Sequence, residues 1–371
     1  MNLTKNKNIC FFLTDLSDPG GIQRVVVELA NFMSKFNNVT IISVYANTMS
    51  KDNKPSYPYE ISEKVRIIYL VEKNAYEKKL VKHINCLLKV VLFSIAAKKH
   101  KFDYIISQGM DSVIWSSTFA MISGAKYICC DHTSYFRKPL WARIGRKISL
   151  LLSHQVIVLT ELDRRQWNSE KVVMIPNPIP VDDNLNIAPL SHRGKNIIAV
   201  GRLVEVKGFI RLLDIWKRVG DNGSSNNYNL KIIGEGPMRA TLDKYIITNN
   251  IKHVTISGFT KEINDIYRHA RLLLVTSFFE GFSMVLIEAM YYGVPAIAFD
   301  VHSGPREIID NNKTGFLVED GNTAKFVELL SSVLNNDVVL NSMSLNGRLK
   351  VNQYRISEVC NKWDKVMNAL E

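Results

Sequence analysis

The stretch Glu280-Gly281-Phe282-Ser283-Met284-Val285-Leu286-Ile287-Glu288-Ala289-Met290 carries two carboxylates eight residues apart, with a tight polar turn after the first. The apolar run 272–276 before it is typical of a buried strand, and Ser283 is suited to cap a helix that stops at Gly293. Glu280 is therefore expected at the carboxyl end of a strand, and Glu288 inside the next helix. Ligands of open parallel sheets bind at these strand ends, where helix N-termini attract phosphate. The two acids are placed to bind hydroxyl groups on either side of a bound diphosphate.

Strand and helix patterns alternate along the chain, which predicts parallel sheets with helices on both faces. A length of 371 residues with 46% apolar content is enough for two cores. The proline-rich segment 175–189 separates two runs of alternation, so we expect domains over 1–180 and 181–355 and a final helix over 356–371. The predicted strands lie at 9–13, 39–44, 65–70, 104–107, 126–129, 156–159, 172–175, 196–200, 230–233, 254–257, 272–276, 295–299 and 315–318.

The net charge of +12 is concentrated in the first half of the chain. Residues 1–180 hold 25 Lys/Arg and 14 Asp/Glu, a balance of +11, whereas residues 181–371 hold 22 and 21, a balance of +1. No zinc-finger, helix-turn-helix or RNA-recognition signature accompanies this charge, so nucleic acid is not the expected partner. An anionic membrane surface explains it better, because the charge coincides with apolar helical patterns.

The clearest of these patterns runs over 136–152, with five basic residues and no acid. A basic amphipathic helix with an interfacial tryptophan is typical of peripheral membrane attachment. A second candidate lies at 78–100. Both segments have an alternative interpretation as ordinary domain helices with solvated basic faces. In 136–152 the basic residues are Arg137, Lys138, Arg143, Arg146 and Lys147, and the apolar set is Leu140, Trp141, Ile144, Ile148 and Leu151.

The five cysteines show no metal-ligand spacing and are interpreted as reduced core thiols of a cytosolic protein. The amino terminus runs into the first strand without a signal-peptide pattern. No segment has the roughly 20 continuous apolar residues that a spanning helix needs. We therefore expect a cytoplasmic protein.

Four motifs together resemble a known family. Gly20-Gly21 follows the first strand, Ile175-Pro176-Asn177-Pro178 lies between the halves, Gly201-Arg202-Leu203 with Lys207-Gly208 opens the second half, and the E-x7-E pair follows. In this order they resemble retaining nucleotide-sugar glycosyltransferases of family four, over nearly the whole chain. The resemblance implies the GT-B fold, in which two Rossmann-like domains face each other across a cleft and the last helix packs back on the first domain.

The resemblance also implies site residues. A departing nucleoside diphosphate leaves negative charge that must be neutralised. The chain has no Asp-x-Asp motif, so no metal or other cofactor is expected, and Arg202 and Lys207 are the candidate cations. Glu280 would orient the transferred sugar. His132 matches the family's active-site histidine and would bond a sugar hydroxyl or a backbone carbonyl without acting as a base.

The donor is expected to be held at several strand ends. Glu288 would accept the ribose hydroxyls, and the Gly20-Gly21 loop would approach the phosphates in a backbone conformation that most residues resist. Whether Asp15, Asp18, Glu235 and Glu307 contact substrate stays open. The expected donor-binding residues are Gly20, Gly21, Glu235, Phe259, Thr260, Phe282, Ser283, Met284 and Glu288.

The implied function is transfer of a hexosyl or N-acetylhexosaminyl residue from a nucleotide sugar, UDP-linked by expectation. The acceptor would be a lipid-linked glycan of the undecaprenyl-diphosphate type, used for bacterial O-antigen, lipopolysaccharide or capsule, on the inner face of the cytoplasmic membrane. The alternatives are a UDP-sugar 2-epimerase of the same fold and a non-catalytic nucleotide-sugar binding protein. The donor sugar, the acceptor, the linkage and the oligomeric state are not determined by the sequence.

Overall fold

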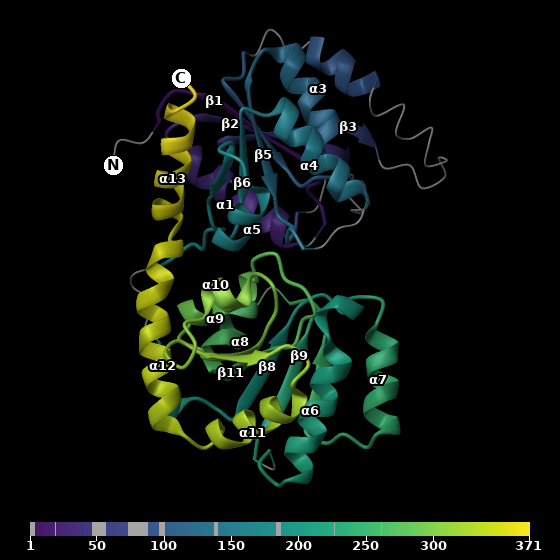
Figure 1. The fold of residues 1–371 in the computed structure, drawn as a ribbon, viewed down its shortest axis with the longest axis vertical. Coiled ribbons are helices and arrows are strands. Elements are labelled where there is room, and N and C mark those ends of the chain that lie inside the picture. Colours follow the sequence, from purple (N-terminus) through teal and green to yellow (C-terminus); the bar gives the residue numbers. More distant parts are fainter. Residues whose placement is uncertain are drawn as a thin grey trace. The chain divides into compact units, whose positions relative to one another are not determined.

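The computed structural model describes residues 4–18, 20–46, 57–72, 88–95, 101–136, 140–182, 187–225, 227–260 and 262–371. The chain divides into two compact units, shown in Figure 1. Unit 1 is Met1–Pro180 with Tyr354–Glu371, and unit 2 is Val181–Gln353. Of the basic segment predicted at 78–100, the structure describes only 88–95, which is helical. Arg137 and Lys138 also lie outside the described residues.

Unit 1 is built on a seven-stranded parallel sheet in the order β3-β2-β1-β4-β5-β6-β7. The chain starts in the middle at β1, runs outward to β3 and then returns to the other side of β1, so the sheet has a topological switch point between β1 and β4. Parallel sheets with helices on both faces were predicted, and the two α/β units confirm the fold class. The strands are β1 (Asn8–Asp15), β2 (Asn38–Ala46), β3 (Val65–Glu72), β4 (Tyr104–Gln108), β5 (Lys126–Asp131), β6 (Gln155–Val158) and β7 (Val172–Met174).

Helices cover both faces of this sheet. Successive residues of β1 point to opposite faces. Cys10 and Phe12 join a buried cluster with Phe119, while their neighbours Ile9 and Phe11 are also fully buried. One face is covered by α1 and α13, and the other by α3, α4 and the helical segment 88–95 (Figure 1). The helices of unit 1 are α1 (Gly21–Met33), α3 (Val113–Ser123), α4 (Leu140–Leu152), α5 (Glu161–Trp167) and α13 (Ile356–Asn368).

Helix α13 is tied to the segment before β1 and to β4 of unit 1 by polar contacts. The backbone N–H of Thr4 donates to Asp364 Oδ1 at 3.2 Å, and the Tyr104 hydroxyl donates to the carbonyl of Met367 at 3.0 Å. At the entry to α13, the Ile179 N–H donates to the Tyr354 carbonyl at 2.8 Å. The last segment of the sequence therefore completes the first unit.

Unit 2 repeats the plan with a six-stranded parallel sheet in the order β10-β9-β8-β11-β12-β13. Its switch point lies between β8 and β11. Helices α6 and α11 pack on one face through a core that includes Trp216 and Phe326. The strands are β8 (Asn196–Val200), β9 (Asn229–Ile233), β10 (Val254–Ser257), β11 (Ala270–Val275), β12 (Ala296–Asp300) and β13 (Phe316–Glu319). The helices are η2 (Leu190–His192), η3 (Glu205–Lys207), α6 (Phe209–Asp221), α7 (Arg239–Thr248), α8 (Ile263–His269), α9 (Met284–Tyr291), α10 (Pro305–Ile308), α11 (Thr323–Val333) and α12 (Asp337–Lys350), with η4 (Val351–Tyr354) at the junction to α13.

Candidate active site

A lysine and a glutamate meet at the switch point of unit 2. Lys207 ends η3 after β8, and Glu280 lies in the loop after β11. The Lys207 Nζ atom lies 2.7 Å from Glu280 Oε1, and the Glu280 side chain is only 7% exposed. The two residues that were predicted separately, one for the phosphates and one for the sugar, thus form one ion pair at the strand ends where ligands bind in such sheets.

Glycine at position 208 makes this approach possible. Its φ of +65° lies in the left-handed region, and a Cβ there would collide with the carbonyl oxygen of Thr276. The Thr276 hydroxyl in turn donates to the Gly208 carbonyl at 3.1 Å. The turn after η3 is therefore packed directly against the end of β11, and Lys207 is fixed beside the Glu280 loop.

The Glu280 carboxylate is held by more than Lys207. The Ser277 hydroxyl donates to Glu280 Oε1 at 2.6 Å, and the Ser303 hydroxyl donates to the Glu280 carbonyl at 3.0 Å. The α-carbon of Gly304 lies so close that a Cβ there would stand 2.8 Å from Glu280 Cβ. The carboxylate therefore has a fixed direction, as an orienting group for a bound sugar requires.

Arg211 of α6 binds the backbone of the same loop, a role that the sequence did not predict. Its guanidinium donates to the carbonyls of Thr276 and Ser277, the second at 2.5 Å. It lies between two aromatic rings, 4.1 Å from the centroid of Phe278 and 4.0 Å from that of Phe299. The polypeptide just before Glu280 is thus bound at two successive carbonyls.

The second acid of the E-x7-E pair lies inside α9 and is buried. Glu288 Oε2 accepts a hydrogen bond from the Tyr267 hydroxyl at 2.8 Å. Tyr267 is itself buried and stacks on Tyr292, with ring centroids 5.7 Å apart. A bidentate contact between Glu288 and ribose hydroxyls would therefore share Oε2 with Tyr267.

Ser283 lies at the predicted N-cap position of α9, but its side chain does not cap the helix. Ser283 adopts a left-handed conformation with φ +61° and ψ 72°, and its side chain makes no capping hydrogen bond. An N-cap side chain reaches the helix N–H groups from an extended backbone, which this residue does not have. The Ser283 hydroxyl is buried and has no hydrogen-bond partner among the residues that the structure describes.

The other residues predicted for the donor lie at neighbouring strand ends. Arg202 is exposed after β8; its carbonyl accepts from the Val204 N–H at 2.8 Å, and its side chain makes no hydrogen bond or ion pair with the described part of the chain. Glu235 is exposed after β9, and its Oε1 atom closely approaches Gly258 in the loop after β10. In that loop Phe259 is exposed, and Thr260 Oγ1 accepts from the Glu262 N–H at 3.0 Å. Two further residues flank Ser283: Phe282, which is buried, and Met284, the first residue of α9.

In unit 1, His132 follows β5 and pairs with Gln108 at the end of β4. The His132 Nε2 atom lies 2.6 Å from Gln108 Oε1. Because an amide oxygen can only accept, Nε2 carries the proton and Nδ1 keeps its lone pair. Burial lowers the pKa of His132 from 6.5 to about 4, so the imidazole is neutral at pH 7. A neutral ring that is anchored at Nε2 fits the predicted role of a hydrogen-bonding group.

This pKa predicts a pH dependence of stability. Below pH 6.5 the unfolded chain protonates His132, whereas the folded protein does so only near pH 4, so the free energy of unfolding falls as the pH falls through this window. Between pH 6.5 and 5 the loss from this residue is on the order of 1–2 kcal/mol. We expect His132→Gln, which keeps a donor for Gln108, to remove that part of the loss in urea unfolding at several pH values. If the free energy of unfolding falls equally steeply with falling pH in the wild type and in the variant, this prediction is wrong.

In the glycine loop after β1, Gly20 does not have the unusual backbone conformation that was predicted. Gly20 has φ −125° and ψ 164°, an extended conformation open to any residue. A Cβ there would stand 2.5 Å from Gln23 Oε1, the end of a flexible side chain that can move, so neither backbone nor space requires glycine at this position. Gly21 is the first residue of α1. Asp15 accepts from the Ser17 N–H at 3.0 Å, and Asp18 is exposed.

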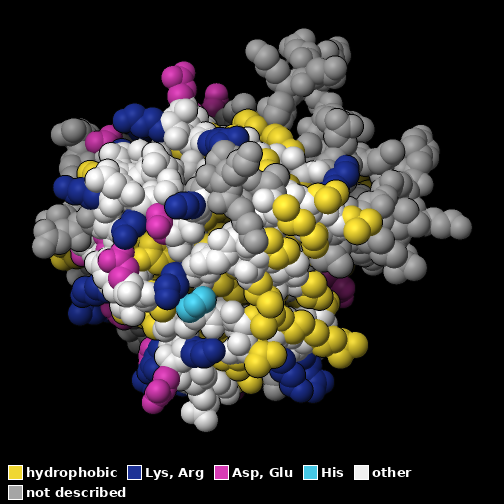
Figure 2. Space-filling model, turned by 90° about the horizontal axis from the view of Figure 1, so that it is seen from above, with side chains coloured by type: hydrophobic (Ala, Val, Ile, Leu, Met, Phe, Trp, Pro, Cys, Tyr) yellow, Lys and Arg dark blue, Asp and Glu magenta, His cyan; other side chains and the backbone are white. Residues whose placement is uncertain are grey.

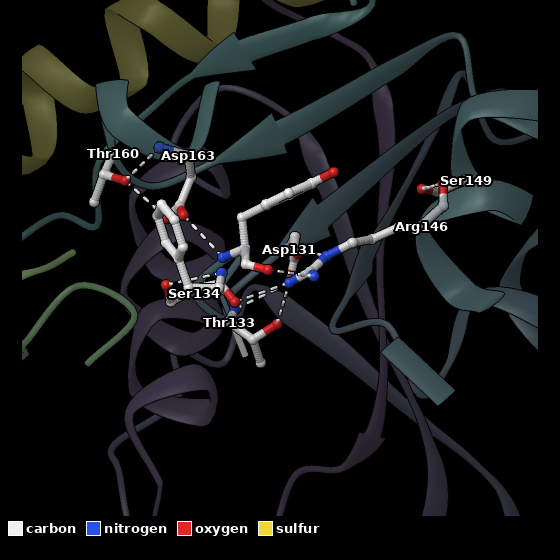
Figure 3. Close-up of polar contacts among 9 residues, drawn as sticks. Asp131, Thr133, Ser134, Arg146, Ser149, Thr160 and Asp163 are labelled. Carbon is white, nitrogen blue, oxygen red and sulfur yellow. Dashed lines mark hydrogen bonds and ion pairs between the residues drawn. The ribbon is translucent and has the colours of Figure 1, made fainter. Parts of the chain in front are cut away.

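The basic segment 136–152 was interpreted in part wrongly. Arg146, expected on the membrane-facing side, is 7% exposed and lies 2.8 Å from Asp131 Oδ2 (Figure 3). Its position follows from the spacing of the buried residues Ala142, Gly145, Arg146 and Ser149, which form one helical stripe. Three of these are small, and Gly145 fits against the Met110 carbonyl, where a Cβ would stand at 2.9 Å.

The large apolar side chains of α4 lie on the side of the helix opposite Arg146 and are exposed. Exposure ranges from 46% at Ile144 to 77% at Leu151, and Ile148 alone of the predicted set packs on the core. Figure 2 shows apolar side chains gathered on this side of the molecule with Lys and Arg beside them. We call this set the outer apolar face. It consists of Leu140, Trp141, Ile144 and Leu151 of α4, Ile114 and Met121 of α3, and Leu88, Leu92 and Ile95.

None of the described helices is long and apolar enough to cross a membrane. Within the described ranges, no group of three or more His, Cys, Asp and Glu side chains is arranged to hold a metal ion. The four described cysteines, Cys10, Cys129, Cys130 and Cys360, are free and buried.

Comparisons with known proteins agree with this architecture. Residues 19–183 match the family model Glycosyltransferase Family 4, and residues 182–350 match Glycosyl transferases group 1. The amylovoran biosynthesis glycosyltransferase AmsD of Erwinia amylovora is 30% identical over 97% of this chain and 99% of its own length. The chain therefore belongs to the glycosyltransferases and has the GT-B fold.

One further relative and two solved structures are similar to this chain over nearly their whole length. A Campylobacter jejuni alpha-1,4-N-acetyl-D-galactosaminyltransferase, named for an undecaprenol diphosphate-linked glycan, is 25% identical over 97% of this chain and 98% of its own. Among solved structures, S. aureus TarM has a TM-score of 0.81 at 16% identity and covers 98% of this chain and 100% of its own. Anabaena HepE in complex with UDP and glucose has a TM-score of 0.77 at 14% identity and covers 97% and 99%.

Proposed function

We propose that this glycosyltransferase moves a hexosyl or N-acetylhexosaminyl residue from a UDP-sugar to a lipid-linked glycan, with retention at the anomeric carbon. The observation that carries the proposal is the Lys207–Glu280 pair at the β8/β11 switch point, beside exposed Arg202 and the unsatisfied Ser283 hydroxyl. Cations and a helix start favour a diphosphate, and an oriented carboxylate favours sugar hydroxyls.

In this mechanism Lys207 and Arg202 stabilise the charge that develops on the β-phosphate, and no metal ion is required. Glu280 orients the sugar, and neutral His132 bonds one of its hydroxyls. Glycoside hydrolases achieve retention with a carboxylate nucleophile. We assign no such nucleophile here and propose that the leaving phosphate takes the proton of the acceptor hydroxyl.

The acceptor is proposed to be an undecaprenyl-diphosphate-linked glycan at the inner face of the cytoplasmic membrane. Two observations support this. The Campylobacter jejuni relative is named for such an acceptor. The outer apolar face, with exposed Arg143 and Lys147 on the same helix, suits an anionic lipid surface. Apolar side chains of this size gathered on one surface are typical of a contact site.

The roles of the two acids can be separated by experiment. A thermal-shift screen of nucleotide sugars first identifies the donor, since a ligand at 100 times its Kd stabilises the folded state by about 2.7 kcal/mol. We expect Glu280→Gln to lower the turnover of UDP release while UDP affinity in calorimetry is kept, and Glu288→Gln to weaken UDP binding. The exposed Glu319 of β13 provides a matched control as Glu319→Gln.

Three results would contradict the proposal. The first is that no nucleotide sugar shifts the unfolding temperature. The second is that both variants lose UDP affinity equally, which would show that the assigned roles are wrong. The third is an inverted anomeric configuration in the product, read by proton NMR, which would remove the retaining mechanism.

A further inference from the structure

A buried polar network encloses the segment that carries His132. Asp131 Oδ1 accepts from the N–H of Thr133 at 3.0 Å and from its hydroxyl at 2.6 Å. Two residues further on, the Tyr135 N–H donates to Asp163 Oδ1 at 2.8 Å. Asp163 is held in turn by the Thr160 hydroxyl at 2.7 Å. The backbone that follows His132 is thus fixed at two N–H groups by two buried carboxylates (Figure 3).

Arg146 of α4 binds the same segment from the other side. Its Nη2 atom donates to the Ser134 carbonyl at 2.9 Å, and its Nη1 atom donates to the Tyr135 carbonyl at 3.0 Å. Nε completes the ion pair with Asp131, and the guanidinium lies 4.9 Å from the centroid of the Tyr135 ring. One guanidinium therefore contacts residues on both sides of His132, and only a planar group with several donors can do so.

The energetics favour a geometric role for this pair over a purely stabilising one. Asp131 and Arg146 are 1% and 7% exposed, so both charges are desolvated. A buried ion pair is often no more stabilising than apolar side chains of similar volume, whereas its directional hydrogen bonds specify one conformation. The side chain of His132 is directed elsewhere, toward Gln108. The network therefore fixes the backbone and leaves the imidazole to its own contact.

We propose that Arg146 is a positioning residue that holds the loop 131–135 so that His132 keeps its place in the transfer reaction. The inference rests on the proposed function, because that function places His132 at the donor sugar. It also gives α4 two tasks. One side of the helix carries Arg146 to the loop, and the other side carries the outer apolar face, so a surface bound by α4 lies one helix away from His132.

The test compares Arg146→Lys with Arg66→Lys, which changes an exposed arginine of β3 in the same unit. Arg146 donates to Asp131, to the carbonyls of Ser134 and Tyr135, and to the Thr133 hydroxyl. A lysine keeps the charge but cannot reach all four of these acceptors. We expect the first variant to move the titration of the His132 ring, followed by NMR of labelled histidine, from about pH 4 toward its ordinary range. We also expect kcat to fall about 10- to 100-fold with KM for the donor unchanged. The second variant should match the wild type in both.

A merely structural role would lower the unfolding temperature and leave the His132 titration of the folded protein unchanged. That result overturns the proposal. If Arg146→Lys does not fold, Thr133→Val decides the matter, because it removes only the hydroxyl between Asp131 and Arg146. The NMR titration requires no sugar substrate, so the two proposals can fail separately. A wild-type protein that transfers no sugar contradicts the proposed function. The NMR titration still shows whether Arg146 positions His132.

Discussion

Lys207→Ala is expected to lower kcat by about 10²-fold or more, because it removes a cation from the leaving diphosphate in the transition state. Arg202→Ala should have a loss of similar size. The two cations differ in setting, since Lys207 is paired with Glu280 whereas Arg202 is exposed. We therefore expect a double-mutant cycle of Lys207→Ala with Glu280→Gln to be strongly non-additive, and a cycle of Arg202→Ala with Glu280→Gln to be closer to additive.

The measurement is initial-rate UDP release at saturating donor, with and without excess chelator. Arg218→Ala, an exposed arginine of α6 in the same unit, is the matched control and should keep wild-type kcat. Transfer should continue in chelator. A loss of activity in chelator that Mn²⁺ or Mg²⁺ restores would show that a metal ion, and not these two side chains, neutralises the diphosphate.

Reversing two charges on α4 is expected to weaken binding to anionic vesicles by about 10²-fold or more. Each basic residue near an anionic leaflet contributes roughly 1 kcal/mol, and Arg143→Glu with Lys147→Glu replaces two attractions with two repulsions. Arg146 stays unchanged in this variant because it is buried in the Asp131 ion pair. Sedimentation with vesicles at increasing salt measures the effect, and UDP affinity should not change.

The control for this variant is Lys244→Glu with Lys252→Glu, which makes the same change in net charge at exposed positions of unit 2. It should sediment like the wild type. Trp141→Ser with Leu151→Ser tests the apolar contribution, which salt does not screen. If the α4 charge variant and its unit 2 control sediment alike, the outer apolar face does not bind lipid and faces another partner.

The fold could be predicted because its elements are local. Each predicted strand is a short apolar run with turn residues on both sides, and every one of them overlaps a strand of the structure. The end of α9 just before Gly293 could also be predicted from a local feature, because that glycine adopts φ +62°, as glycines after a helix commonly do. Where the conformation departs from the common pattern, sequence reasoning failed. Ser283 lies at the N-cap position, but its backbone is left-handed and its side chain makes no capping hydrogen bond.

The partners of the site residues could not be predicted, because they are set by the order of strands in the sheet. Lys207 and Glu280 are 73 residues apart in sequence and meet only because β11 lies beside β8. Gln108 and His132 meet through the neighbouring strands β4 and β5. For Arg146 a signal existed: the stripe of small residues at its helical spacing marks the buried side of α4. The size of the apolar residues on the opposite side concealed it.

Because unit 1 is formed by two separate segments of the chain, its two parts are synthesised at different times. The chain leaves unit 1 after Pro180 and returns to it at Tyr354, so Val181–Gln353 is synthesised before the segment that contacts Thr4 and Tyr104. Until α13 emerges from the ribosome, the side of α1 that packs against it has no cover, and exposed apolar surface of this kind favours aggregation. Unit 2 has no such delay, because all its strands are contiguous in sequence. A chain that stops at residue 353 thus contains a complete second domain and an unfinished first one.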